Sequence, residues 1–263
     1  MAEGNVCLLV TRALVDALAE TPISSATERL TARHCIGALQ KLSMHPPSAK
    51  TMIENGVVPA AARVIKLICT NQLPMHVSVL RRANALLLNL VYFKEGVTAA
   101  RESDAVAAAT AATGGGAGGI REDADVLGAL CHMIDSEFSS FGDDLGRRSA
   151  TAAMFCLLKD PVLWQSAKQR DFVPRLKSVL QRLSLITSAR DFCKELNALI
   201  SVLEKPSAPN VAPSSSVSVD EGEADEGFED EFPDAVSLFV PTLRGTEEIE
   251  AKKLTHTLVR AQM

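Results

Sequence analysis

Apolar residues recur along most of the chain at the 3.6-residue spacing of amphipathic helices. One such stretch runs from Cys7 to Leu18, and a second carries Leu30, Ile36 and Leu39. The same pattern predicts further helices over residues 48–54, 60–69, 77–93, 126–134, 145–158, 162–170, 174–185 and 188–204. Because helical spacing extends from residue 7 to residue 204, the fold class predicted is all-α.

Two short passages of sequence repeat. Gly56-Val57-Val58-Pro59 and Asp171-Phe172-Val173-Pro174 each follow a short polar helix and open a longer apolar one. The ends of the long helices also match, at 38–42, 86–90, 154–158 and 198–202, with steps of 48, 68 and 44 residues. Repeats of about 40–47 residues that contain two or three helices are typical of armadillo arrays. We therefore expect an armadillo-like superhelical solenoid of about four repeats.

The pattern divides the chain into four segments. They are an N-terminal helix (1–23), the repeat domain (24–205), an acidic linker (206–233) and a C-terminal tail with a short helix (234–263). Inside the repeat domain, the Ala/Gly-rich stretch 103–120 is expected to be a flexible loop insertion before a third unit that begins at Asp123. The linker is expected to be disordered, because dense acids repel one another and cannot form a core.

Composition narrows the classes of function. Hydrophobic residues make up 47% of the chain and aromatics only 4%, with a net charge of −5. Such a chain lacks the basic excess of a nucleic-acid-binding protein, and its apolar runs are too short for membrane insertion. The six cysteines are scattered without a C-x-x-C motif, and no histidine pair has metal-ligand spacing. We therefore expect reduced, buried cysteines, no metal and no cofactor.

No motif for catalysis is present in the sequence. The glycine tract Gly114-Gly115-Gly116 lacks the Lys-Ser/Thr of a phosphate-binding loop, and no strand is expected before it. No G-x-S-x-G elbow occurs. The chain is therefore expected to make contacts rather than to perform chemistry, so catalytic residues are not assigned.

Two surfaces are candidates for binding a partner. Asn89 lies near the end of a long helix, where an asparagine contacts the peptide backbone in peptide-binding armadillo proteins. The second candidate is a basic surface that includes Arg175, Lys177 and Arg182, for which a solvated helix face is the alternative. Its other members are Arg147, Arg148, Lys168 and Arg170.

The acidic segment has a candidate regulatory site. Ser218 is followed three residues later by Glu221, which is the pattern of an acid-directed kinase site. Phe228 and Phe232 lie among the acids, like anchors of a recognition peptide. We hypothesise that this segment binds a basic groove, either a partner's or this chain's own face of Arg175, Lys177 and Arg182. The alternative is a solubilising spacer.

One family is similar to this chain beyond the general repeat. The runs Ala38–Ser43 and Ala85–Leu90, with Met52-Ile53 and Gly56 between them, resemble the C-terminal half of the LisH-domain-containing armadillo protein of cilia. The similarity covers about residues 24 to 232. It implies a non-catalytic protein of the basal body and cilium with ciliary or centrosomal protein partners. The LisH motif of the family has no counterpart before Ser24, so its dimerisation is not carried over and no oligomeric state is predicted.

Together these features predict a protein–protein interaction scaffold in cilium assembly, stability and signalling. The expected location is the cytoplasm, the cytoskeleton and the basal body. One alternative is a general cytoplasmic adaptor of transport or the ubiquitin pathway. The other is an enzyme whose site has no recognisable motif.

Overall fold

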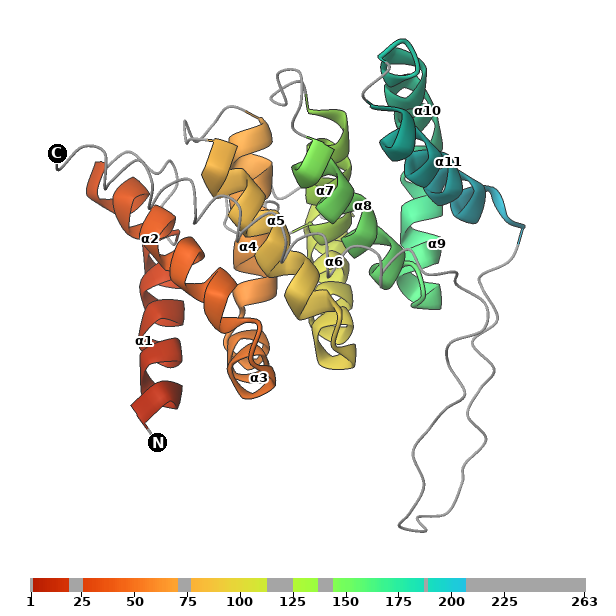
Figure 1. Ribbon diagram of the computed structural model, residues 1–263. Coiled ribbons are helices and arrows are strands. Elements are labelled where there is room, and N and C mark those ends of the chain that lie inside the picture. Colours follow the sequence, from red (N-terminus) through yellow and green to blue (C-terminus); the bar gives the residue numbers. More distant parts are fainter. Residues whose placement is uncertain are drawn as a thin grey trace, which may run out of the picture. The chain divides into compact units, whose positions relative to one another are not determined.

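A computed structural model describes residues 2–18, 26–70, 77–112, 125–136, 144–186 and 189–206, which form helices and the turns that join them (Figure 1). They all belong to one unit of the chain, Met1–Val211. Within these residues the all-α prediction is confirmed. The expectations for Ser218, for 113–120 and for the segments from residue 207 onward lie outside the described residues.

Eleven helices are present in the described ranges. They are α1 (Ala2–Ala17), α2 (Ala26–Leu42), α3 (Pro46–Glu54), α4 (Val57–Cys69), α5 (Val77–Val91), α6 (Lys94–Ala112), α7 (Val126–Asp135), α8 (Asp144–Leu157), α9 (Pro161–Gln169), α10 (Phe172–Leu183) and α11 (Arg190–Glu204). Two helices, α3 and α9, have proline as their first residue, where the missing N–H has no helical partner to lose. None of the helices in these ranges is both long and apolar enough to span a membrane.

Contacts between the helices recur with a period of three. Helices α1, α4, α7 and α10 form one row in which each helix contacts the next, and α3, α6 and α9 form another. The row of α2, α5, α8 and α11 runs across Figure 1 from the orange α2 to the blue-green α11. Three consecutive helices, such as α3–α5 or α9–α11, therefore form one repeating unit.

The core of each unit is built on its long third helix. In α5, the side chains of Leu86, Leu87, Leu88 and Leu90 are all buried, although they point in different directions around the helix. This burial is possible because α5 contacts α2, α4 and α8 on different sides. A helix that is apolar on nearly every face is stable in water only when neighbours cover it in this way.

Helix α6 corrects the prediction of a loop insertion at 103–120. Residues 103–112 are helical, and α6 takes the place in the third unit that α3 and α9 take in theirs. The third unit therefore begins at Lys94 and not at Asp123. The Ala-rich sequence favours a helix, and Ala100, Asp104 and Ala107 are buried on it. Gly96 lies in the first turn of α6. Glycine is needed there because a Cβ would collide with the Leu90 carbonyl oxygen of α5.

The repeated passages of sequence form the same tight turn. Gly56 joins α3 to α4 with φ of 79°, and Asp171 joins α9 to α10 with φ of 54°. Both residues therefore have the left-handed backbone conformation, which glycine adopts without a steric penalty and aspartate tolerates. The repeat in the sequence reflects a repeated backbone requirement.

We expect Gly56→Ala to lower the free energy of unfolding by about 1 kcal/mol, because a Cβ is disfavoured at positive φ. No atom lies within 4 Å of the new methyl group, so the cost comes from the backbone alone. Asp171→Gly is the matched control at the equivalent turn and should change stability by less than about 0.5 kcal/mol. Urea denaturation followed by circular dichroism measures both, and equal losses would contradict this explanation.

Candidate functional site

Asn89 joins two units. Its side chain lies near the end of α5, is half-buried, and donates from Nδ2 to Ser43 Oγ over 2.9 Å. The Ser43 hydroxyl in turn donates to the Gln40 carbonyl over 2.7 Å. The asparagine therefore holds the end of α2 against α5, and one of its amide hydrogens is already used in that contact.

The three basic residues of the predicted surface, Arg175, Lys177 and Arg182, each form an ion pair with a carboxylate of this chain. Arg175 and Arg182 of α10 both contact Asp135 at the end of α7, at 3.2 and 2.6 Å. Lys177 contacts Glu204 at the end of α11 at 2.5 Å. Two arginines thus attach α10 to the preceding unit, and their positive charge is partly neutralised there.

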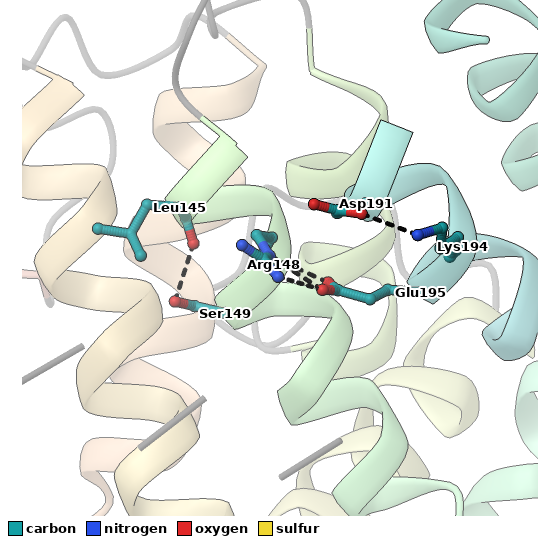
Figure 2. A network of polar contacts seen from close by, with 6 residues as sticks. All are labelled: Leu145, Arg148, Ser149, Asp191, Lys194 and Glu195. Atoms are coloured by element: carbon teal, nitrogen blue, oxygen red, sulfur yellow. Dashed lines mark hydrogen bonds and ion pairs between the residues drawn. The ribbon is translucent and has the colours of Figure 1, made fainter. Parts of the chain in front are cut away.

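The other four basic residues of the predicted surface also join helices. Arg148 of α8 donates from Nε to both carboxylate oxygens of Glu195 on α11, at 3.0 and 3.2 Å (Figure 2). Arg147 is buried and donates to the Ser136 carbonyl over 2.7 Å. Lys168 donates to the Lys205 carbonyl and lies 4.6 Å from the centre of the Trp164 ring. The Arg148–Glu195 pair therefore joins the third and fourth units, whereas Arg147 and Lys168 each join helices within one unit.

Arg170 is the centre of a largely buried polar cluster at the start of α7. Its guanidinium contacts Asp125, the N-cap of α7, and lies 3.4 Å from Asp104 of α6. Asp104 Oδ1 accepts from the Val126 amide over 2.9 Å, and its side chain is only 4% exposed. Asp125 Oδ1 accepts from the Gly128 amide over 2.8 Å. The cluster joins α6, α7 and α9, because two acids cap one helix and one arginine bridges them.

The proton affinity of Asp104 is unusual. Burial and the neighbouring Asp125 carboxylate raise the pKa of Asp104 to about 6, although Arg170 and the two backbone amides act in the opposite direction. Burial dominates because it removes the water that stabilises the charged form. The folded protein therefore binds this proton more tightly than the unfolded chain does.

We expect the stability contributed by Asp104 to fall as pH rises from about 4 to about 6. It is fully present below the usual pKa of 3.8 and is lost above the folded value of about 6. The change is on the order of 1–3 kcal/mol. Urea unfolding between pH 4 and 8 should show this slope in the wild type and in the exposed-site control Asp16→Asn, but not in Asp104→Asn. The same slope in all three proteins would contradict the assignment.

Two cysteines of the described ranges have thiols whose pKa is strongly raised. Burial raises the pKa of Cys69 to about 12 and that of Cys131 to about 11, so both thiols stay protonated near neutral pH. No group of three or more His, Cys, Asp or Glu side chains in those ranges has a geometry that could hold a metal ion.

A second basic region, which the sequence motifs did not predict, lies on α2 to α5. Residues 26–91 contain eight lysines and arginines against two acids, a net charge of +6. Arg33, Lys41, Lys50 and Arg82 are exposed there. Counting charge segment by segment, rather than over the whole chain, would have revealed this region from sequence.

A shallow apolar hollow lies beside α3, in the same part of the molecule. It has a volume of about 280 Å³. Its lining consists of Pro46, Pro47, Lys50, Ile53, Phe93 and Glu95. We call it the α3 hollow. Two exposed apolar side chains flank this lining in sequence, Met44 at 46% exposure and Tyr92 at 66%.

Comparison with known proteins gives no family for this chain. No protein-family model matches it, and no curated protein and no solved structure shows a significant match.

Proposed function

We propose that the chain is a non-catalytic protein–protein interaction scaffold built as an armadillo-like solenoid. The observation that carries this proposal is the period of three helices, in which α3, α6 and α9, α4, α7 and α10, and α5, α8 and α11 take equivalent places. The positive-φ turns at Gly56 and Asp171 support the same repeat. Repeats stacked in this way present extended surfaces, which is why such arrays serve as binding platforms.

Partner binding is proposed on the row of α2, α5, α8 and α11, with Asn89 as the contact to a peptide backbone. Asn89 keeps a second amide hydrogen and a carbonyl oxygen beyond the bond to Ser43. Arg175, Lys177 and Arg182 are proposed as additional contacts at the rim of the last unit. Their ion pairs are half-exposed, and exposed pairs are weak enough for a partner's carboxylate to compete.

The proposed setting is a ciliary or basal-body assembly, and it is supported by the resemblance of residues 24–232 to the ciliary LisH/armadillo family. The polar clusters between helices support a scaffold rather than an enzyme, since their charged groups face one another and join units. The general cytoplasmic adaptor is the second candidate, because the same repeat surface would serve it equally.

Localisation and proximity labelling test this proposal. The full-length chain, tagged with a biotin ligase and expressed in ciliated cells, should label basal-body and centrosomal proteins above a ligase-only control. Diffuse labelling dominated by transport or ubiquitin-pathway proteins would instead favour the adaptor. Asn89→Ala is the first variant to compare. The Asn89→Ala variant should label the direct partner less than the wild type does. Its location in the cell should stay the same where another surface of the chain determines that location.

A further inference from the structure

Helix α5 packs beside α2, and the two helices run in the same direction. A Cβ on Gly37 of α2 would lie 2.9 Å from Nη1 of Arg82 on α5. About two turns further along both helices, Asn89 donates to Ser43 over 2.9 Å. Arg82 and Asn89 lie on one side of α5, because seven residues make about two turns of helix. The guanidinium of Arg82 is therefore placed against α2 at Gly37.

Exposed residues of α2 lie on both sides of Gly37 along the helix. Arg33 and Lys41 are four residues before and after it, so about one turn separates each of them from Gly37. Leu30 and Met44 continue this surface at its two ends, with 53% and 46% exposure. Because a guanidinium from α5 lies on Gly37, three cations follow one another along α2. We call this surface the α2 stripe, and it consists of Leu30, Arg33, Gly37, Lys41, Met44 and Arg82 of α5.

The α2 stripe is positively charged. Helices α2 and α5 together contain five lysines and arginines against one acid, a net charge of +4. That acid, Glu28, precedes Gly37 by nine residues, or about two and a half turns, so it lies on the opposite side of α2. Among the residues that the structure describes, Arg33, Lys41 and Arg82 form no ion pair with a carboxylate, unlike several arginines of the last two units. An acidic ligand therefore meets three cations here without displacing an acid of this chain.

The spacing of these cations matches that of side chains on an extended peptide. Four residues of helix rise by about 6 Å, so Arg33, the guanidinium on Gly37 and Lys41 follow one another at about that interval. Side chains on one face of an extended peptide repeat every second residue, or about every 6.6–6.8 Å. A peptide with acids at alternate positions therefore presents one carboxylate to each cation. At the Met44 end, Asn89 keeps a second amide hydrogen that is available to a peptide carbonyl.

We propose that the α2 stripe binds an acidic segment of a partner protein in extended conformation. Acids at alternate positions face Arg33, Arg82 and Lys41, and apolar side chains at the ends of the segment contact Leu30 and Met44. A short acidic segment fits better than nucleic acid, because the net charge of −5 on the whole chain repels a long polyanion. This inference rests on the proposed scaffold function, since it gives the chemistry of the partner, but it does not depend on the ciliary setting.

Fluorescence anisotropy with the full chain tests the proposal. The probe is a labelled nine-residue peptide with glutamate at positions three, five and seven, leucine at both ends and alanine elsewhere. At low salt it should bind at least about tenfold more tightly than the same peptide with glutamine in place of glutamate, since each exposed charge pair contributes about two- to fivefold. The difference should largely vanish at about 0.5 M salt, because exposed charges are then screened.

Substitutions in the protein locate the binding surface. Arg33→Gln, Lys41→Gln and Arg82→Gln should each weaken binding of the glutamate peptide about two- to fivefold. Lys50→Gln on α3 is the matched control, because it removes the same charge outside the α2 stripe, and it should change the affinity less than about 1.5-fold. Equal losses in Lys50→Gln and Lys41→Gln would overturn the proposal. Melting curves identify any variant that unfolds, and Arg33→Gln, which alters an exposed side chain, decides the question if Arg82→Gln does not fold.

Four other outcomes would overturn the proposal. If the glutamate and glutamine peptides bind equally and Asn89→Ala weakens both, the acidic chemistry is wrong while the proposed scaffold function stands. If neither peptide binds, the acidic chemistry is wrong as well, and proximity labelling decides the scaffold function separately. Tighter binding of an oligothymidylate of equal charge would identify nucleic acid as the ligand. A dimeric mass in light scattering that the peptide reduces to one copy would identify a second copy of this chain as the occupant.

Discussion

Leu87→Asp is expected to abolish folding of the helical array. Leu87 is fully buried in α5, which α2, α4 and α8 contact. Truncating a buried leucine alone costs about 2–5 kcal/mol, and burying an unpaired carboxylate adds several more. That sum is comparable to the whole stability of a typical domain, about 5–15 kcal/mol. Circular dichroism should show loss of most helical signal at 25 °C.

Leu158→Asp should have a similar effect, since Leu158 is 1% exposed after the end of α8. The matched control is Leu30→Asp on α2, because the same substitution there affects a side chain that is 53% exposed. The control should change stability by less than about 1 kcal/mol. If Leu87→Asp and Leu30→Asp melt alike, α5 is not the enclosed helix of its unit.

Arg170→Leu is expected to lower the free energy of unfolding by about 3–5 kcal/mol at pH 7.5, the range for breaking a buried ion pair. The substitution leaves Asp104 buried beside Asp125 without the cation that both contact. Chemical denaturation measures the loss. At pH 5 the loss should be smaller, because a protonated Asp104 no longer needs a cation.

Two comparisons test this explanation. Lys194→Leu removes the cation of an ion pair with Asp191, and the two side chains are 71% and 77% exposed, so its effect should be much smaller than that of Arg170→Leu. Adding Asp104→Asn to Arg170→Leu should recover part of the lost stability, which a double-mutant cycle quantifies. Independent, additive effects of the two substitutions would show that the residues do not interact.

Several charged side chains form contacts between the third and fourth units. Arg148, Arg170, Arg175 and Arg182 all form polar contacts there, whereas α2, α4 and α5 meet largely through apolar side chains. Polar joints depend on pH and salt more than apolar ones do. The last unit is therefore expected to separate from the array more readily than the first units as conditions change.

Much of the helical organisation follows from the sequence by itself. The 3.6-residue spacing locates helices such as α4, α7 and α10 to within a few residues, because one apolar stripe facing a core is enough to define a helix. The repeated passages at Gly56 and Asp171 also identify the equivalent turns, since a positive φ restricts the residues that fit. These signals are local, so a single sequence contains them.

The place of α6 and the ion pairs between units depend on tertiary contacts that the sequence does not show. Helix α6 has only a weak apolar stripe and a glycine near its start, and what makes it the first helix of a unit is its burial of Ala100, Asp104 and Ala107 against neighbours. Likewise, a group of arginines in the sequence predicts a binding surface, because the sequence does not show which carboxylates contact those arginines after folding. Asp135, Glu195 and Asp125 lie 40, 47 and 45 residues from their arginine partners, and only folding brings them together.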